Sequence, residues 1–246
     1  MHAIVTGAAG GIGSAVVAQL VELDVRVYAW DVSRAALDRL RDAHGPLVQP
    51  RCVDVASAAS VGDAAMEVAS TEGAPDYLVC AAGINPLTES TEAIDDAFYN
   101  TVMSVNLTGC FNACRCVLPG MARRGRGSVV NVASVSGLLG WGGSSAYSAS
   151  KGGMIAFTRA RAIEYAPQSV RVNAVCPGSV RTEMVLGNLR ARGDVEPGLA
   201  RIAAKHPMGR MGEPSEVASV VTFLLGKGAS FVTGTAVPID GGLSAW

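Results

Sequence analysis

Short apolar runs alternate with helical patterns along almost the whole chain, and this alternation restricts the possible folds most. Seven runs are predicted to be strands: residues 3–6, 25–30, 47–53, 77–80, 128–133, 170–176 and 236–239. Six helices are predicted: residues 11–23, 34–43, 61–70, 94–123 (with a break near Ser104), 147–165 and 214–225. Strands that are apolar throughout are typical of a parallel sheet covered on both faces. We therefore predict an α/β fold, a Rossmann-like, doubly wound, seven-stranded parallel sheet with helices on both faces.

The size and charge of the chain fit one such domain. Its 246 residues are 49% hydrophobic, and 20 basic against 21 acidic side chains leave a net charge of −1. This balance argues against a nucleic-acid binder that neutralises phosphates. No repeat or low-complexity linker interrupts the pattern, so we expect a single domain over residues 1–246. Residues 181–212 are predicted to be a substrate-loop insertion over the sheet edge.

The six cysteines are predicted to be buried, reduced thiols. Cys110, Cys114 and Cys116 are closely spaced, which leaves a metal site as the alternative, but no histidine lies near them and they form no C-x-x-C pair. We predict no bound metal. The chain has no signal-peptide pattern and no run of about 20 apolar residues, so a cytoplasmic protein without a membrane span is expected.

A glycine-rich turn joins the first predicted strand to the first predicted helix, with the sequence TGAAGGIG at residues 6–13. Gly7 would permit the tight turn, Gly11 the approach of a pyrophosphate to the backbone around Ile12, and Gly13 the close packing of helix on strand. The helix N-terminus then offers free N–H groups to phosphates. The alternative is a glycine turn that binds no ligand.

Asp31 ends the second predicted strand, 18 residues after Gly13. A dinucleotide fold places a carboxylate there, on the ribose hydroxyls of the adenosine. Such a carboxylate would repel a 2′-phosphate, so NAD is favoured over NADP. Arg34 could offset the repulsion, but a solvated position on the next helix is expected for it.

Asp54 and Val55 follow the third predicted strand. The Asp54 side chain could meet the adenine amino group. It could equally cap the helix that begins near Ala58.

Tyr147 and Lys151 lie four residues apart and share one helix face. A phenol loses its proton near pH 10, and a nearby ammonium is expected to lower the pKa of Tyr147. A tyrosine tuned in this way can serve as general acid or base for an alcohol and its ketone. Ser134, at the end of a predicted strand, could hold the oxygen of the substrate.

These features together resemble the short-chain dehydrogenase/reductase family over essentially the whole chain. The matching elements are residues 6–13, Asp54, residues 81–83, Asn106, Ser134, residues 147–151, Asn173, Pro177, Gly178 and residues 240–242. The resemblance implies an NAD(P)-dependent alcohol dehydrogenase or ketone reductase, usually a homotetramer.

The resemblance also implies roles for particular residues. Tyr147 would exchange a proton with the substrate, Lys151 would bind the nicotinamide ribose, and Ser134 would orient the carbonyl. Asn106 would hold a water that relays protons from Lys151, although it could also be an asparagine that breaks a long helix. The remaining cofactor-binding residues implied are Val55, Ala82, Gly83, Pro177, Gly178, Val180 and Thr182.

The chain departs from the family at one point. Cys80 and Ala81 stand where the family commonly has two asparagines. The missing amides are expected to weaken a local hydrogen-bond network that supports the sheet.

The substrate pocket is expected to draw on residues 84–87, 136–141 and 184–189. Its predicted members are Ser136, Leu138, Trp141 and Met184, with Leu139 and Leu186. These apolar side chains suggest an uncharged, largely hydrocarbon substrate, although Trp141 could instead lie in a subunit contact. Four cations could attract an anionic tail such as that of an acyl thioester, or could form a solvated helix face: Arg190, Arg192, Arg201 and Lys205.

Three functions remain open from the sequence. The first is transfer of a hydride between NAD(H) and a secondary alcohol or ketone. The second is a 3-oxoacyl-thioester reductase that acts on an acyl carrier protein or CoA substrate, a hypothesis weakened by Asp31. The third is a catalytically inactive dinucleotide-binding sensor. Apolar residues on the helix after Lys151 could form a subunit interface or cover the sheet: Met154, Ile155, Phe157, Ala160 and Ile163.

Overall fold

The computed structural model, which describes residues 1–86 and 90–245, contains a seven-stranded parallel sheet. Its strands are β1 (His2–Thr6), β2 (Arg26–Asp31), β3 (Val48–Cys52), β4 (Tyr77–Cys80), β5 (Gly127–Val132), β6 (Val170–Pro177) and β7 (Ala236–Ile239). They lie in the order β3-β2-β1-β4-β5-β6-β7, and each neighbouring pair is parallel. All seven predicted strands are present, with ends within one residue of the prediction. The predicted fold class is confirmed.

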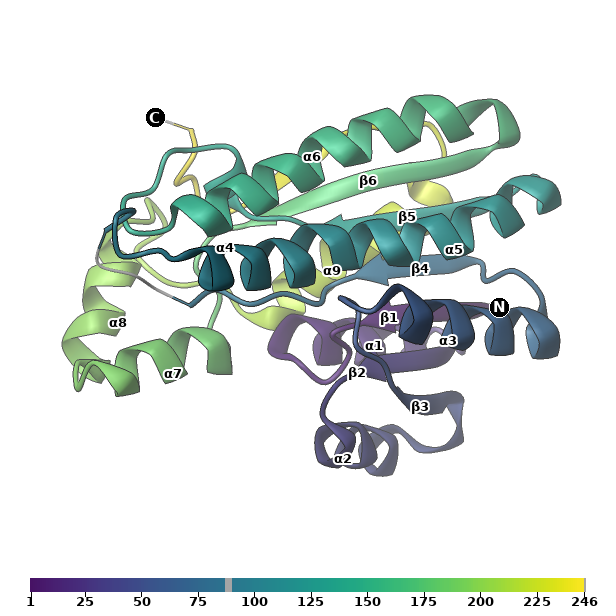
Figure 1. Cartoon of the computed structure of the whole chain (residues 1–246), viewed down its shortest axis with the longest axis horizontal. Helices are drawn as coiled ribbons and strands as arrows, with labels where there is room; N and C mark the ends of the chain where they lie inside the picture. Colours follow the sequence, from purple (N-terminus) through teal and green to yellow (C-terminus); the bar gives the residue numbers. More distant parts are fainter. Residues whose placement is uncertain (87–89, 246) are drawn as a thin grey trace.

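Helices cover both faces of the sheet (Figure 1). They are α1 (Gly11–Glu22), α2 (Arg34–His44), α3 (Ala58–Glu72), α4 (Asp96–Met103), α5 (Gly109–Arg124), α6 (Ser145–Tyr165), α7 (Glu183–Ala191), α8 (Val195–Ala204) and α9 (Pro214–Leu225). One core cluster joins a sheet face to α3, α5 and α6, and a second joins the opposite face to α1, α2 and α9. The two buried faces explain why the strands are apolar throughout.

The predicted helix over residues 94–123 is interrupted where the sequence indicated. Helix α4 ends at Met103, a π-helical turn spans Ser104–Thr108, and α5 begins at Gly109. A π-helical turn inside an α-helix often marks a functional site. This one carries the buried Asn106.

Residues 181–212 contain two helices that the sequence did not predict, α7 and α8. A parallel bridge between Val180 and Gly212 closes the base of this insertion. The expectation that it covers the sheet edge is wrong, because α7 and α8 lie beyond the carboxyl ends of the strands (Figure 1). The apolar side chains of α7 and α8 face a cavity and the neighbouring helix. Because they do not pack on the sheet, the sequence of this segment has no long apolar stripe of the kind that predicts a helix. Within the described residues, no helix is both long and apolar enough to cross a bilayer.

Candidate active site

A cavity of about 1160 Å³ opens at the carboxyl ends of the strands, where ligands bind in doubly wound sheets. Most of the predicted site residues line it: Gly7, Gly11, Ile12, Gly13, Asp31, Asp54, Val55, Ala82, Gly83, Ser134, Ser136, Trp141, Tyr147, Lys151, Pro177, Gly178, Val180, Thr182 and Met184. The cavity runs from the glycine-rich turn to α7 and α8. It therefore brings the predicted cofactor and substrate residues together.

A few predicted pocket residues lie elsewhere. Leu138 is 38% exposed and does not line the cavity, and neither Leu139 nor Leu186 does. Leu138 and Leu139 follow the short helical turn at Val135–Gly137, and the cavity lining resumes only at Trp141. Residue Leu87 of the predicted 84–87 segment lies outside the described residues.

The glycine-rich turn leaves no space for larger side chains. Gly7 has φ +63°, and a Cβ there would lie 2.6 Å from the backbone of Ala82. A Cβ on Gly13 would overlap the carbonyl oxygen of Gly7, so this glycine lets α1 pack on the turn, as predicted. Helix α1 begins without a side-chain cap and without an acidic residue in its first turn. Its first N–H groups and positive dipole end therefore fit a phosphate ligand.

Asp31 is fixed beside this turn by two backbone groups. Its carboxylate accepts hydrogen bonds from the N–H of Ala9 and the N–H of Ser33, both at 3.1 Å. Arg34 points elsewhere, since it is ion-paired with Asp38 on the exposed face of α2. The turn and the carboxylate together fit the phosphate and ribose ends of a dinucleotide.

Asp54 does not cap α3. The cap is Ser57, whose side chain accepts the N–H of Ser60 at 3.2 Å. Asp54 instead accepts the N–H of Ala56 at 2.9 Å in a local turn. The capping alternative is therefore wrong, and contact with an adenine stays a prediction.

Tyr147 lies in the first turn of α6, and Lys151 lies one turn later. The Lys151 ammonium is 5.7 Å from the centre of the Tyr147 ring and donates a hydrogen bond to the Val132 carbonyl at 2.8 Å. Burial lowers the pKa of Lys151 to about 8. Burial also raises the pKa of Tyr147, although a hydrogen bond with Ser134 opposes the rise. The lowered pKa expected for Tyr147 is therefore not found, because desolvation outweighs the hydrogen bond with Ser134.

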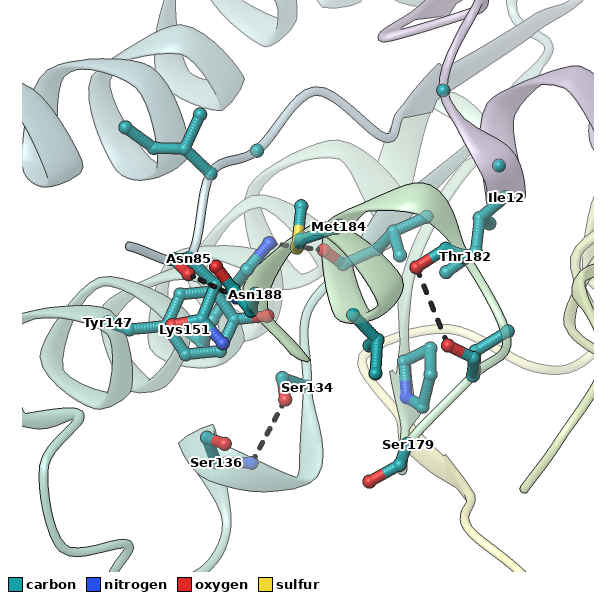
Figure 2. A pocket seen from close by; sticks show the side chains of 18 of the residues that line it. Ile12, Asn85, Ser134, Ser136, Tyr147, Lys151, Ser179, Thr182, Met184 and Asn188 are labelled. Carbon is teal, nitrogen blue, oxygen red and sulfur yellow. Dashed lines mark hydrogen bonds between the residues drawn. The ribbon is translucent and has the colours of Figure 1, made fainter. Parts of the chain in front are cut away.

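Ser134 follows β5 by two residues and caps the helical turn at Val135–Gly137. Its hydroxyl accepts the N–H of Ser136 at 3.1 Å (Figure 2). The hydroxyl oxygen is thereby oriented, and its proton is free to be donated to Tyr147 or to a ligand.

Asn106 lies behind the cavity wall, in the π-helical turn. It donates hydrogen bonds to the Ile84 carbonyl at 3.0 Å and to the Ser150 hydroxyl at 3.1 Å. A Cβ on Gly83 would lie 3.3 Å from its Oδ1 and 3.4 Å from the Lys151 ammonium. Asn106 and Lys151 therefore approach the same glycine. This position is compatible with both interpretations of Asn106, as a residue that interrupts the long helix and as a functional group.

Two further contacts position the insertion over the cavity. Asn188 of α7 donates to the carbonyl of Asn85 at 3.1 Å (Figure 2). His206, which follows α8, is buried, and its Nε2 accepts the N–H of Ser179 at 3.1 Å while Nδ1 lies 2.9 Å from the Ile202 carbonyl. Sequence analysis missed His206. A lone histidine inside the insertion was the only signal available.

The cysteines are only partly as predicted. All six are free, but Cys52 is exposed and Cys116 is half-buried. The Sγ atoms of Cys80, Cys110 and Cys114 lie within 4.8 Å of one another, so Cys80 joins this group in place of Cys116. Asn131 contacts the group, since its Oδ1 lies 3.3 Å from the Cys110 sulfur.

The environment of Asn131 bears on the departure at Cys80. Its amide nitrogen donates to the Thr158 hydroxyl at 2.9 Å, and its oxygen accepts from the Cys110 thiol. The buried amide is therefore hydrogen-bonded on both sides, with a weak thiol donor on one of them. The effect of Cys80 and Ala81 on stability stays a prediction.

Comparison with known proteins identifies the family. Residues 7–244 match the family described as "Enoyl-(Acyl carrier protein) reductase". The 2-(S)-hydroxypropyl-CoM dehydrogenase 3 of Xanthobacter autotrophicus is 37% identical over 98% of this chain and 95% of its own length. The cis-4-hydroxycyclohexanecarboxylate dehydrogenase of Sinomonas cyclohexanicum is 39% identical over 99% and 96%. The chain belongs to the short-chain dehydrogenase/reductase family.

The solved structures agree with this assignment. The crystal structure of levodione reductase superposes with a TM-score of 0.96 at 34% identity, over 99% of this chain and 97% of that one. The protein is thus an oxidoreductase of the short-chain dehydrogenase/reductase type, a family that acts on alcohols and ketones with a nicotinamide dinucleotide.

Proposed function

We propose that this short-chain dehydrogenase/reductase transfers a hydride between NAD(H) and a secondary alcohol or its ketone, with Tyr147 as general acid and base. The observation that carries the proposal is one shared cavity. Ser134, Tyr147 and Lys151 line the same cavity as the uncapped N-terminus of α1 and the carboxylate of Asp31. A substrate oxygen at Tyr147 and a dinucleotide along the glycine-rich turn would therefore meet.

Each of four side chains has its own role in the transfer of the proton. The dinucleotide supplies the hydride acceptor or donor. Ser134 orients the substrate oxygen through a hydroxyl held by Ser136, and Tyr147 takes or gives the proton of that oxygen. Lys151, with a pKa of about 8, can pass that proton on near neutral pH. Asn106, close to Gly83 and Lys151, would hold the water that carries it to solvent.

NAD is the proposed cofactor because of Asp31. Its carboxylate lines the cavity beside the glycine-rich turn, while Arg34 is engaged with Asp38 on the helix surface. A 2′-phosphate would face this negative charge without a compensating arginine. A related structure, an actinorhodin polyketide ketoreductase at 37% identity, was solved with NADPH, and the ratio of activity with NAD to activity with NADP distinguishes the two cofactors.

The substrate is proposed to be a secondary or cyclic alcohol. Relatives are named for hydroxypropyl-CoM, hydroxycyclohexanecarboxylate and cyclohexanol, each with a secondary alcohol. A 3-oxoacyl-[acyl-carrier-protein] reductase of Thermotoga maritima, 38% identical, supports the second candidate, reduction of a 3-oxoacyl thioester. The third candidate, an inactive sensor, predicts cofactor binding without turnover.

One experiment separates these candidates. Purified protein is mixed with NAD or NADP and a panel of secondary and cyclic alcohols, and with NADH or NADPH and a 3-oxoacyl thioester, and nicotinamide absorbance is followed. We expect NADH to form with secondary alcohols and Tyr147→Phe to abolish that activity. The control is Tyr165→Phe, at the other end of α6 and outside the cavity lining. Full activity in Tyr147→Phe would refute the mechanism, and NADH binding without any turnover would favour the sensor.

We also propose a cytoplasmic homotetramer and a single domain that includes residues 181–212. Met154 and Ile155 are buried against the sheet, but Ile163 on the same helix is 77% exposed and Phe157 packs edge-on against the exposed Phe111. This outer face of α5 and α6 is a candidate interface. Light scattering of wild type and Ile163→Lys would test it, since a monomeric wild type would exclude the tetramer.

A further inference from the structure

Positive charge gathers where α7 and α8 end beside the cavity. Arg192 directly follows α7, Lys205 directly follows α8, and both line the cavity that holds Tyr147. The Lys205 ammonium lies 4.6 Å from the centre of the Trp141 ring, which also lines the cavity. A cation is attracted to the face of an indole, so this contact holds the ammonium at the cavity wall.

The carboxylates at this end of the cavity are already occupied. Glu183 is ion-paired with Arg190, and Asp194 is ion-paired with Arg201. The four cations considered in the sequence analysis therefore differ: Arg190 and Arg201 are neutralised by these ion pairs, while Arg192 and Lys205 are not.

Arg192 and Lys205 keep their charge available to a ligand. Across residues 1–86 and 90–245, neither forms an ion pair with a carboxylate. The other acidic residues of the cavity lining are Asp31, which ends β2, and Asp54, which follows β3; both lie at the opposite end, beside the glycine-rich turn. The end of the cavity formed by α7 and α8 is therefore positively charged.

An apolar surface accompanies the two cations along this end of the cavity. Its side chains are those of Met184, Val185, Leu189, Ile202 and Leu243. A ligand that contacts both this surface and the cations must combine a hydrocarbon body with a negatively charged group.

We propose that the substrate carries an oxyanion, a carboxylate or a sulfonate, separated by a hydrocarbon segment from the secondary alcohol or ketone, and that Arg192 and Lys205 bind this oxyanion. This inference rests on the proposed function for the reacting end of the substrate. It replaces the uncharged substrate expected from the sequence with an amphipathic one. Arg192 supplies paired N–H donors that match the two oxygens of a carboxylate, and Lys205 supplies a point charge.

A purely structural role for the two cations makes a different prediction. Both lie at helix C-termini, where a positive side chain stabilises the helix dipole. If that were their only role, neutral variants would lose stability, and kcat/KM would change by the same factor for charged and uncharged substrates. An oxyanion site instead requires a loss that is confined to the charged substrate.

The first test compares cyclohexanol with 4-hydroxycyclohexanecarboxylate, which share a ring and a secondary alcohol. We expect the carboxylate to have a kcat/KM roughly tenfold higher, the size of one charge-assisted hydrogen bond. Arg192→Gln and Lys205→Gln should each raise KM for the carboxylate several-fold, whereas KM for cyclohexanol should not change. Arg190→Gln is the matched control, because that arginine is paired with Glu183 and lies outside the cavity lining. Equal kcat/KM values for the two alcohols in wild type would overturn the proposal.

The second test needs no turnover. Binding of cyclohexanecarboxylate and cyclohexanesulfonate in the presence of NAD is measured by calorimetry, with cyclohexanol as the neutral reference. We expect both anions to bind more tightly than the reference, with a difference that shrinks as salt rises from about 0.01 M to about 1 M and the Debye length falls from about 30 to 3 Å. The anion that binds more tightly shows whether the site prefers a carboxylate or a sulfonate. Anion binding that persists in the Arg192→Gln, Lys205→Gln double variant would overturn the site, whereas anion binding without oxidation of any alcohol would sustain it and refute the proposed function.

Discussion

Asn106 and Ile84 exchange two hydrogen bonds: the Ile84 N–H donates to the Asn106 Oδ1 at 2.8 Å, and the Asn106 amide donates to the Ile84 carbonyl at 3.0 Å. This pair ties the π-helical turn to the segment that follows β4. The segment includes Gly83, where Asn106 and Lys151 come together. The pair therefore fixes one wall of the cavity from behind.

Replacing Asn106 with alanine should reduce both stability and turnover. The change removes both hydrogen bonds to the half-buried backbone of Ile84, at a cost of about 0.5–1.5 kcal/mol each in the free energy of unfolding. We expect kcat to fall at least roughly tenfold while NADH affinity changes little, because proton relay is lost and the glycine-rich turn is intact. Denaturant unfolding, steady-state kinetics and NADH titration measure the three quantities.

Asn173→Ala is the control for that variant. Asn173 is also fully buried and makes two hydrogen bonds to backbone groups, those of Val232 and Thr235, but it does not line the cavity. It should lose similar stability and keep its kcat. If the two variants lose the same fraction of kcat, Asn106 has only a structural role.

Gly13→Ala should abolish cofactor binding or folding. Its Cβ would overlap the carbonyl oxygen of Gly7, so the turn and the start of α1 must separate. We expect NADH affinity to fall by more than roughly tenfold in whatever folded protein remains, since the first N–H groups of α1 are displaced. Gly62→Ala is the control, because a Cβ there has no atom within 4 Å in the described structure and lies inside α3. That control should gain about 0.5–1 kcal/mol in the free energy of unfolding.

The fold could be predicted because its signals are local. Strands β4 and β7 were predicted with their observed ends, since each is a short apolar run that begins directly after a polar residue, Asp76 or Thr235. Ser104 begins the π-helical turn, where a break was expected. Helices α7 and α8 could not be predicted in the same way, because their apolar side chains face a cavity and each other rather than a sheet.

A site residue could be predicted only where its side-chain type and its position relative to a predicted strand or helix together indicate one chemical role. Tyr147, Lys151 and Ser134 fall in this group, and the structure places all three in the cavity lining. The pKa of Tyr147 could not be predicted from spacing, because its direction depends on burial. His206 was missed for a similar reason, since its hydrogen bond to Ser179 joins segments that only the fold brings together.

Asp31→Asn should relax the cofactor preference. The amide can still accept one of the two backbone N–H groups that the carboxylate accepts, so the turn keeps its shape, while the charge that repels a 2′-phosphate is removed. We expect the ratio of kcat/KM for NAD to that for NADP to fall by at least roughly tenfold. Asp42→Asn, an exposed carboxylate near the end of α2 that pairs with Arg41 and not with Arg34, should leave the ratio unchanged. An unchanged ratio in Asp31→Asn would refute the assignment of this residue.

His206→Ala should weaken cofactor binding more than it slows chemistry. The change removes the acceptor of the Ser179 N–H and loosens the segment that begins at Pro177 and Gly178, both of which line the cavity. We expect KM for NAD to rise several-fold with a smaller change in kcat. His206→Gln, which offers a carbonyl acceptor, should recover part of the affinity. A rise in KM of equal size in both variants would contradict a role for the hydrogen bond.

Lys151 should make the stability of the protein depend on pH in the alkaline range. Burial lowers its pKa from 10.5 to about 8, so between those values the folded protein has released a proton that the unfolded chain still binds. Since stability rises with pH wherever the unfolded state binds more protons, Lys151 opposes folding below pH 8 and loses that effect as pH rises toward 10.5.

The measurement is the free energy of unfolding of wild type minus that of Lys151→Met, taken from pH 7 to pH 10.5. Burial raises the pKa of Cys176 to about 11 and also raises that of Tyr147, and both groups act in the opposite direction, so only the difference isolates Lys151. We expect the difference to rise with pH by about 3 kcal/mol, from about 1.4 kcal/mol per pH unit. The exposed Lys227, changed to methionine, should follow the wild-type curve. A difference that is flat or falls with pH would show that Lys151 is not desolvated in the folded protein.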